Sequence, residues 1–249
     1  MIRKLFKTFY LYPWILVSTM VMGALTIVVT LLVRPADRAR HWGHRVAQLW
    51  ARSILWASGV TVTVIGAEHL AEAGSSILMP NHQSHFDIPV LLGALDTEFR
   101  WLAKAELFKI PIFGRAMRGC GYISIDRSNR QSAFASIGKA FDTIRGKVSV
   151  LIFPEGTRSP DGQLLPFKKG GFVLAVDAGV PILPIGVHGT RRILPKNRLL
   201  LDPGPVVLYL HPPIDTREYD REHKELLMDV VRQSLTEAVA CADRGRTRC

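Results

Sequence analysis

The sequence has few cysteines and, over its first 60 residues, almost no acidic side chains. Its three cysteines, Cys120, Cys241 and Cys249, are widely spaced, so they suggest neither a disulfide framework nor a paired metal site. This usage fits a reducing compartment. The chain also lacks an internal repeat, and its 249 residues suit one α/β domain, alone or with an appendage.

Basic residues are concentrated at the N-terminus. Residues 1–60 hold eight Lys and Arg against the single acid Asp37, which is +7 of the formal net charge of +11. Anionic lipid is the natural partner of basic residues beside an apolar segment. A nucleic-acid-binding protein would more often carry a basic stripe on its folded domain, so no nucleic-acid partner is expected.

Leu11–Val33 is a run of 23 residues without charge. As a helix it would extend about 34 Å, enough to cross a hydrocarbon core of roughly 30 Å. A cleaved signal peptide is the alternative, but Arg34 and Pro35 follow the run where a small-residue cleavage site would stand. The basic flanks place the main domain on the cytoplasmic face of a membrane, whether the segment spans the bilayer or re-enters it.

The next segment, 41–59, has the periodicity of an amphipathic helix. Such a helix commonly packs on a folded domain. The preferred interpretation is an interfacial helix whose arginines face phosphate headgroups, because four of the five tryptophans precede residue 60 and tryptophan favours headgroup depth. Residues 1–59 are therefore predicted to be membrane-associated helices. The apolar stripe is Trp42, Val46, Leu49, Trp50 and Ile54, and the polar side is His41, Arg45, Gln48 and Arg52.

From residue 60 short β-rich runs alternate with helical stretches. This pattern predicts an α/β fold over residues 60–240, with a mostly parallel sheet flanked by helices and ligands at the carboxyl ends of strands. Residues 241–249 are interpreted as a basic tail. Strands are expected at 60–65, 76–79, 99–103, 122–125, 148–153, 182–187 and 206–210, and helices at 88–95, 130–145, 170–178 and 221–240.

A first polar motif, Asn81-His82-Gln83-Ser84-His85-Phe86-Asp87, follows a predicted strand. The imidazole of His82 can take a proton near neutral pH without a large pKa shift. A carboxylate bonded to its second nitrogen would fix the tautomer and stabilise the imidazolium, as in serine hydrolases. Asp87 is also well placed to cap a helix that begins at the following residues.

Two other chemistries for this motif have less support. His82, His85 and Asp87 could ligate a metal, but no further cluster is spaced to complete the ligand set. Ser84 could be a nucleophile, but it lacks the Gly-x-Ser-x-Gly setting.

A second polar motif, Phe153-Pro154-Glu155-Gly156-Thr157-Arg158-Ser159, follows another predicted strand. Arg158 offers a planar fork of donors that matches phosphate oxygens. Gly156 permits a tight turn, and Thr157 can donate to phosphate or cap the next segment. Glu155 either orients the loop or accepts from a substrate hydroxyl. On its own, this motif could equally be a turn with a solvated arginine.

With both motifs in this order, the chain resembles the glycerolipid acyltransferases, in particular the 1-acylglycerol-3-phosphate acyltransferases, which make phosphatidic acid. The resemblance covers residues 60–215 and includes Gly121–Arg127 and Val180–Pro184. It implies that His82 and Asp87 are the general-base pair.

The resemblance also implies a substrate and a set of binding residues. The acceptor would be a lysophosphatidate at the membrane, the donor acyl-CoA or acyl carrier protein, with no metal, no cofactor and no covalent acyl-enzyme. Arg158, Arg127 and Lys104 would hold the acceptor phosphate. For Lys104, a salt bridge to Glu106 or simple solvation stays open. Another lysolipid acceptor, or a membrane scaffold without turnover, is the alternative function.

Overall fold

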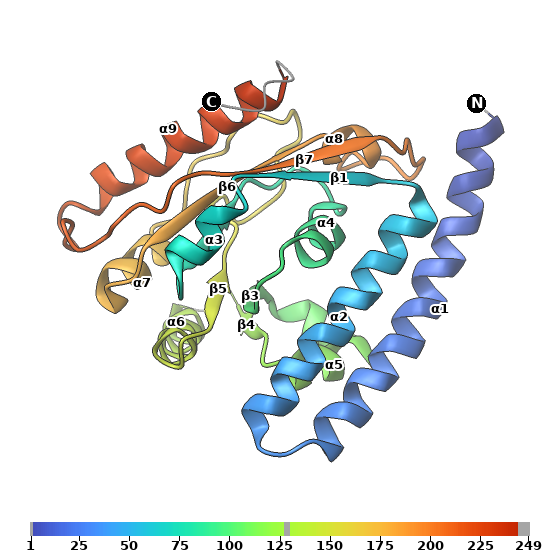
Figure 1. Ribbon diagram of the computed structural model, residues 1–249, viewed down its shortest axis with the longest axis horizontal. Coiled ribbons are helices and arrows are strands. Elements are labelled where there is room, and N and C mark those ends of the chain that lie inside the picture. The colour runs from blue at the N-terminus through green and yellow to red at the C-terminus, as the bar shows by residue number, and fades with distance from the viewer. Residues whose placement is uncertain (1, 127–129, 244–249) are drawn as a thin grey trace.

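A seven-stranded sheet with the order β1-β7-β6-β2-β5-β3-β4 forms the centre of the fold (Figure 1). The computed structural model describes residues 2–126 and 130–243. β6, β2, β5, β3 and β4 run parallel, whereas β7 is antiparallel to β6 and parallel to β1. The predicted mostly parallel α/β fold is confirmed. The strands are β1 Thr61–Ile65, β2 Ile77–Pro80, β3 Phe99–Lys104, β4 Ile123–Ile125, β5 Ser149–Leu151, β6 Ile182–His188 and β7 Pro205–Leu210.

Helices cover both faces of this sheet. β2 shows why two cores arise, because successive side chains of a strand point to opposite faces. Leu78 packs into the core under α2 and α4, whereas Ile77 and Met79 pack into the core under α6, α7 and α9. The helices are α1 Ile2–Leu32, α2 Ala36–Ser58, α3 Glu68–Ala73, α4 Asp87–Ala94, η1 Ala105–Lys109, α5 Phe113–Gly119, α6 Arg130–Arg145, α7 Gly170–Ala178, α8 Thr190–Ile193 and α9 Lys224–Asp243.

The predicted boundaries of the larger elements are close to those of the structure. All seven strands are present with ends within two residues, and α6 and α7 match exactly the predicted 130–145 and 170–178. α9 begins three residues later than predicted, because the Asp220 carboxylate accepts from the backbone N–H of Glu222 and His223 and forms a turn first. The short helices α3, η1, α5 and α8 were not predicted.

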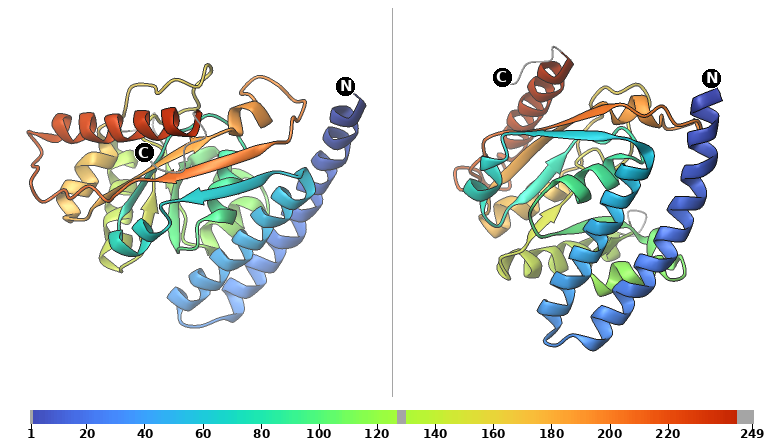
Figure 2. Two further views of the ribbon diagram at one scale, coloured as in Figure 1. Left: turned by 45° about the horizontal axis from the view of Figure 1, so that its top comes forward. Right: turned by 45° about the vertical axis from the view of Figure 1, so that its right-hand side comes forward.

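α1 and α2 form an antiparallel hairpin along one flank of the domain (Figure 2). α1 begins at Ile2, nine residues before the predicted uncharged run. From Lys7 to Leu32 it is long and apolar enough to cross a membrane, by length and composition. Its outer side exposes large apolar side chains, among them Leu16 at 66%. The opposite side packs on α2 and α5.

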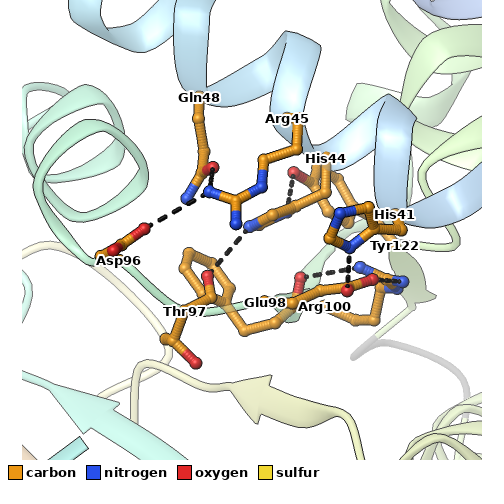
Figure 3. Close-up of polar contacts among 10 residues, drawn as sticks. His41, His44, Arg45, Gln48, Asp96, Thr97, Glu98, Arg100 and Tyr122 are labelled. Carbon is orange, nitrogen blue, oxygen red and sulfur yellow. Dashed lines mark hydrogen bonds and ion pairs between the residues drawn. The ribbon is translucent and has the colours of Figure 1, made fainter.

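The polar side of α2 is hydrogen-bonded to the domain (Figure 3). Arg45 and Arg52 are exposed but also bind protein, so their contact with lipid headgroups stays a prediction. The side chains of this polar side bind the segment 93–98, which joins α4 to β3, and we call the set of contacts the α2 ladder. The distances are 2.6 Å for His41 Nδ1 to Glu98 Oε2, 3.3 Å for His44 Nε2 to the Thr97 carbonyl, 3.3 Å for Arg45 Nη1 to Asp96 Oδ1, 3.1 Å for Gln48 Nε2 to the Leu95 carbonyl and 3.0 Å for Arg52 Nε to the Gly93 carbonyl.

Candidate active site

His82 and Asp87 lie on the turn between β2 and the first residue of α4. His82 Nδ1 is 2.7 Å from Asp87 Oδ2, and the same oxygen accepts from the backbone N–H of Gln83 and Ser84 at 2.7 and 2.9 Å. Asp87 is fully buried. Because a carboxylate only accepts, His82 donates through Nδ1 and leaves the lone pair of Nε2 available. Asp87 therefore receives the N–H groups of the turn before it and does not cap α4.

Aromatic packing orients the His82 ring. The ring stacks on Phe153 at a centroid distance of 3.8 Å, and Phe153 in turn lies 5.7 Å from the Trp101 ring. The Ser84 hydroxyl donates to the Leu194 carbonyl at 2.7 Å. Ser84 is thus engaged in holding the turn, and His82 remains partly accessible beside it.

Glu155 joins the two motifs. Its Oε1 accepts from the His82 backbone N–H at 2.7 Å and its Oε2 from that of Leu165 at 2.9 Å, while the Ser159 N–H donates to the His82 carbonyl at 2.8 Å. Burial raises the pKa of the Glu155 carboxyl, and the two backbone donors oppose that rise. Both oxygens bind protein backbone, so in this geometry Glu155 orients the loop.

Arg158 presents a donor without a partner. Its Nη1 is buried and has no hydrogen bond among the described residues, which is costly for a charged group unless a ligand supplies the acceptor. The Lys196 ammonium donates to the Arg158 carbonyl at 3.1 Å, which adds a second cation nearby. Burial and the Arg158 charge both lower the pKa of His85, in that order. The site is therefore suited to an anionic group.

The other predicted binding residues are placed differently. Gly156 has a φ of +71°, a conformation that other residues rarely adopt, and Thr157 is exposed. Lys104 ends β3 at the same sheet edge, is exposed, and pairs with Glu106 at 3.2 Å. Arg127 lies outside the described residues.

An apolar cavity of about 490 Å³ opens next to the turn that holds His82 and Asp87. His85 and Phe86 of the turn line it, and the hairpin helix α1 contributes Gly23 and Thr26 from far along the chain. Gly23, Thr26 and Lys196 stand in no motif, so the sequence gives no signal for these three residues. Among residues 2–126 and 130–243, no three His, Cys, Asp or Glu side chains are grouped so as to hold a metal ion.

Residues 61–188 match the family model for acyltransferases, and the chain belongs to this acyltransferase family. It is similar to the crystal structure of the 1-acyl-sn-glycerophosphate acyltransferase from Thermotoga maritima, with a TM-score of 0.80 and 32% identity over 95% of this chain and 96% of that one.

Curated relatives carry the corresponding name. The chloroplastic 1-acyl-sn-glycerol-3-phosphate acyltransferase of Brassica napus is 34% identical over 90% of this chain and 64% of its own length. The 1-acyl-sn-glycerol-3-phosphate acyltransferase of Salmonella typhimurium is 34% identical over 69% of each chain. The chain thus spans less than two thirds of the Brassica relative.

Proposed function

We propose that the protein transfers a fatty acyl group from acyl-CoA or acyl carrier protein to the free hydroxyl of 1-acylglycerol-3-phosphate and so makes phosphatidic acid. The names of the relatives support this acceptor. The observation that carries the proposal is the juxtaposition of an oriented base with an unpartnered cation: the His82–Asp87 pair is bonded, through Glu155 and Ser159, to the loop that holds Arg158.

We assign the following reaction to this geometry. His82 Nε2 removes the proton from the acceptor hydroxyl as that oxygen attacks the thioester carbonyl, and Asp87 stabilises the imidazolium that forms. Collapse of the tetrahedral intermediate breaks the carbon–sulfur bond. The imidazolium returns its proton to the departing thiolate, so the products are an ester and a free thiol.

The acceptor phosphate is assigned to Arg158, with Lys104 and Arg127 as further cations. A planar guanidinium matches two phosphate oxygens at once. Gly156 and Thr157 shape the loop around that phosphate. The apolar cavity beside His85 is assigned to an acyl chain, because burying methylene groups there removes them from water.

The membrane arrangement follows from the hairpin. α1 packs along α2, and α2 is bound to the domain by the α2 ladder, which supports a placement of α1 along one leaflet over a full span of the bilayer. We therefore assign residues 1–59 to membrane contact, with the outer side of α1 in one leaflet, and residues 60–240 to the acyltransferase domain. The basic N-terminus favours the cytoplasmic face.

An acceptor panel tests this function. The purified full chain is given acyl-CoA with lysophosphatidate, lysophosphatidylcholine, a lyso-aminolipid or monoacylglycerol, and thiol release is followed. We expect kcat/KM for lysophosphatidate to exceed that for monoacylglycerol by about 10- to 150-fold, the range for one charge-assisted hydrogen bond. A higher value for another lysolipid would reassign the acceptor, and no thiol release with any acceptor or donor would indicate a scaffold.

A further inference from the structure

The segment from Leu194 to Leu201, between α8 and β7, forms a closed loop. The Asp202 N–H donates to the Ile193 carbonyl at 2.9 Å, which ties the two ends together, and the Arg198 N–H donates to the Pro195 carbonyl at 3.1 Å within it. We call it the 194–201 loop. A compact loop with joined ends presents its tip as a defined surface.

The base of the 194–201 loop is fixed to both catalytic motifs. Ser84, inside the first motif, donates to the Leu194 carbonyl, and Lys196 donates to the carbonyl of Arg158, inside the second. Leu194 and Leu199 also line the apolar cavity. The loop therefore lies where a lipid would enter the site.

The other side of the loop is bound to α1 (Figure 2). The Tyr12 hydroxyl donates to the Leu199 carbonyl at 3.0 Å, and the Leu201 N–H donates to Thr8 Oγ1 at 3.0 Å. Leu201 itself is buried in the core. The loop surface is thus continuous with the apolar outer side of α1.

The tip of the loop combines exposed leucines with cations. Leu199 is 77% exposed and Leu200 is 50% exposed. Between Gly189 and Leu201 the chain has four Lys and Arg and no acid. Apolar side chains flanked by cations suit the boundary between acyl chains and anionic headgroups.

We propose that the 194–201 loop is a second membrane-contact element beside α1, with an anionic phospholipid surface as its partner. Leu199 and Leu200 insert at the headgroup–acyl boundary, and Arg198 lies among the phosphates. This contact holds the mouth of the active site against the lipid from which the acceptor is drawn. The inference rests on the proposed function for that acceptor and deepens it.

Three matched leucines test the contact. In a background with Cys241→Ser and Cys249→Ser, single Leu16→Cys, Leu200→Cys and Leu226→Cys variants of the full chain carry an environment-sensitive fluorophore. Leu226 is 58% exposed and belongs to α9, which lies on another side of the domain from α1 (Figure 1). On phosphatidylglycerol vesicles we expect the probes at 16 and 200 to brighten and to be quenched by nitroxide-labelled lipid, and the probe at 226 to stay unchanged.

A second measurement uses vesicle partition. Leu200→Gln should lower the partition coefficient by up to about tenfold, the change for withdrawing a half-exposed leucine from lipid. The melting temperature should stay unaltered, and Leu226→Gln should not lower the partition coefficient. A dark, unquenched probe at 200 beside a quenched probe at 16 would overturn the inference and leave the α1 contact in place. The probes do not depend on turnover, so a failed acceptor panel would reject only the proposed function.

Discussion

Asp87 uses a single oxygen for three donors, and this arrangement makes the side chain a positioning group for His82. An amide at this place would keep the shape of the turn. It would lose the charge that stabilises the imidazolium, and its NH2 group would have to occupy a buried position. The pair should therefore behave as one functional unit.

His82→Ala should lower kcat by about 10²–10⁴, the range for a positioned general base, with little change in acceptor KM. Asp87→Asn should also be severe while near-UV circular dichroism stays unchanged. The double variant should be no slower than the worse single variant, because the residues act together. Additive losses in this cycle would mean that the two side chains work separately.

Arg158→Ala should lower kcat/KM for lysophosphatidate by about 10- to 150-fold, because a charge-assisted hydrogen bond to phosphate is lost. Arg158→Lys should recover only part of the loss, since the two-pronged geometry is gone. Steady-state kinetics with phosphate-bearing and phosphate-free acceptors measures both effects.

Arg217→Ala is the matched control, since Arg217 is exposed and its Nη2 donates to Asp215 Oδ2 at 2.6 Å. It should leave kcat/KM nearly unchanged. Equal losses of Arg158→Ala activity on both kinds of acceptor would remove Arg158 from the phosphate site.

The sequence predicts the candidate residues that stand in motifs, but not the residues that reach the candidate site from elsewhere in the chain. His82, Asp87 and Arg158 follow predicted strands, and parallel strands bring such residues to one edge. The two uses of Glu155 could not be separated, because the choice depends on backbone donors such as that of Leu165, ten residues away. Lys196 was missed because it stands in a loop without a pattern.

At the scale of elements, periodicity identifies an amphipathic helix but not what each side meets. The polar side of α2 contains charged residues suited either to headgroups or to the polar segment 93–98, and only the folded chain shows the second. α6 and α7 were predicted within their exact bounds because each has at least two turns of clear pattern. α8, with four residues, is too short for such a pattern.

His44 should make the α2 ladder sensitive to acid. The Thr97 carbonyl accepts from its Nε2, Tyr122 lies 3.1 Å from its Nδ1, and burial lowers the pKa of His44 to about 4. The unfolded chain binds the proton first, near pH 6.5, so above that pH the neutral, buried His44 costs no stability. As the pH falls towards 4, protonation of the unfolded chain lowers the free energy of unfolding by roughly 3 kcal/mol.

Thermal unfolding of the wild type and of His44→Gln from pH 7 to pH 4 measures this effect. The variant cannot titrate at this position, so its melting temperature should fall less steeply over that interval than that of the wild type. Parallel curves would show that His44 does not control the acid response.

At the scale of the whole molecule, the hairpin that we propose for membrane contact is also part of the fold. Ala51, Ile54 and Leu55 of α2 belong to the core under that face of the sheet. Deleting residues 1–59 would therefore expose this core, so it cannot separate membrane binding from folding. The outer side of α1 offers a cleaner test, because its side chains leave the core intact.

Replacing Leu16, Val21 and Leu25 together by glutamine should release the protein from phosphatidylglycerol vesicles, with at least a tenfold loss of partition, because three exposed apolar side chains leave the lipid. Vesicle flotation measures the loss, and the melting temperature in detergent should change little. The matched control replaces Leu226 and Val230, exposed on α9. Unchanged flotation of the α1 variant would place the membrane contact elsewhere.

The position of β1 at the edge of the sheet has a consequence for biosynthesis. The hairpin and β1 leave the ribosome well before β7, yet β1 pairs with β7, whose Pro205 lies opposite Thr61 and 144 positions later in the chain. The hydrogen bonds of the α2 ladder likewise cannot form until segment 93–98 has been synthesised. An apolar hairpin exposed during that interval can meet a bilayer before the sheet closes, so membrane contact of the nascent chain would precede completion of the fold that brings His82 and Arg158 together.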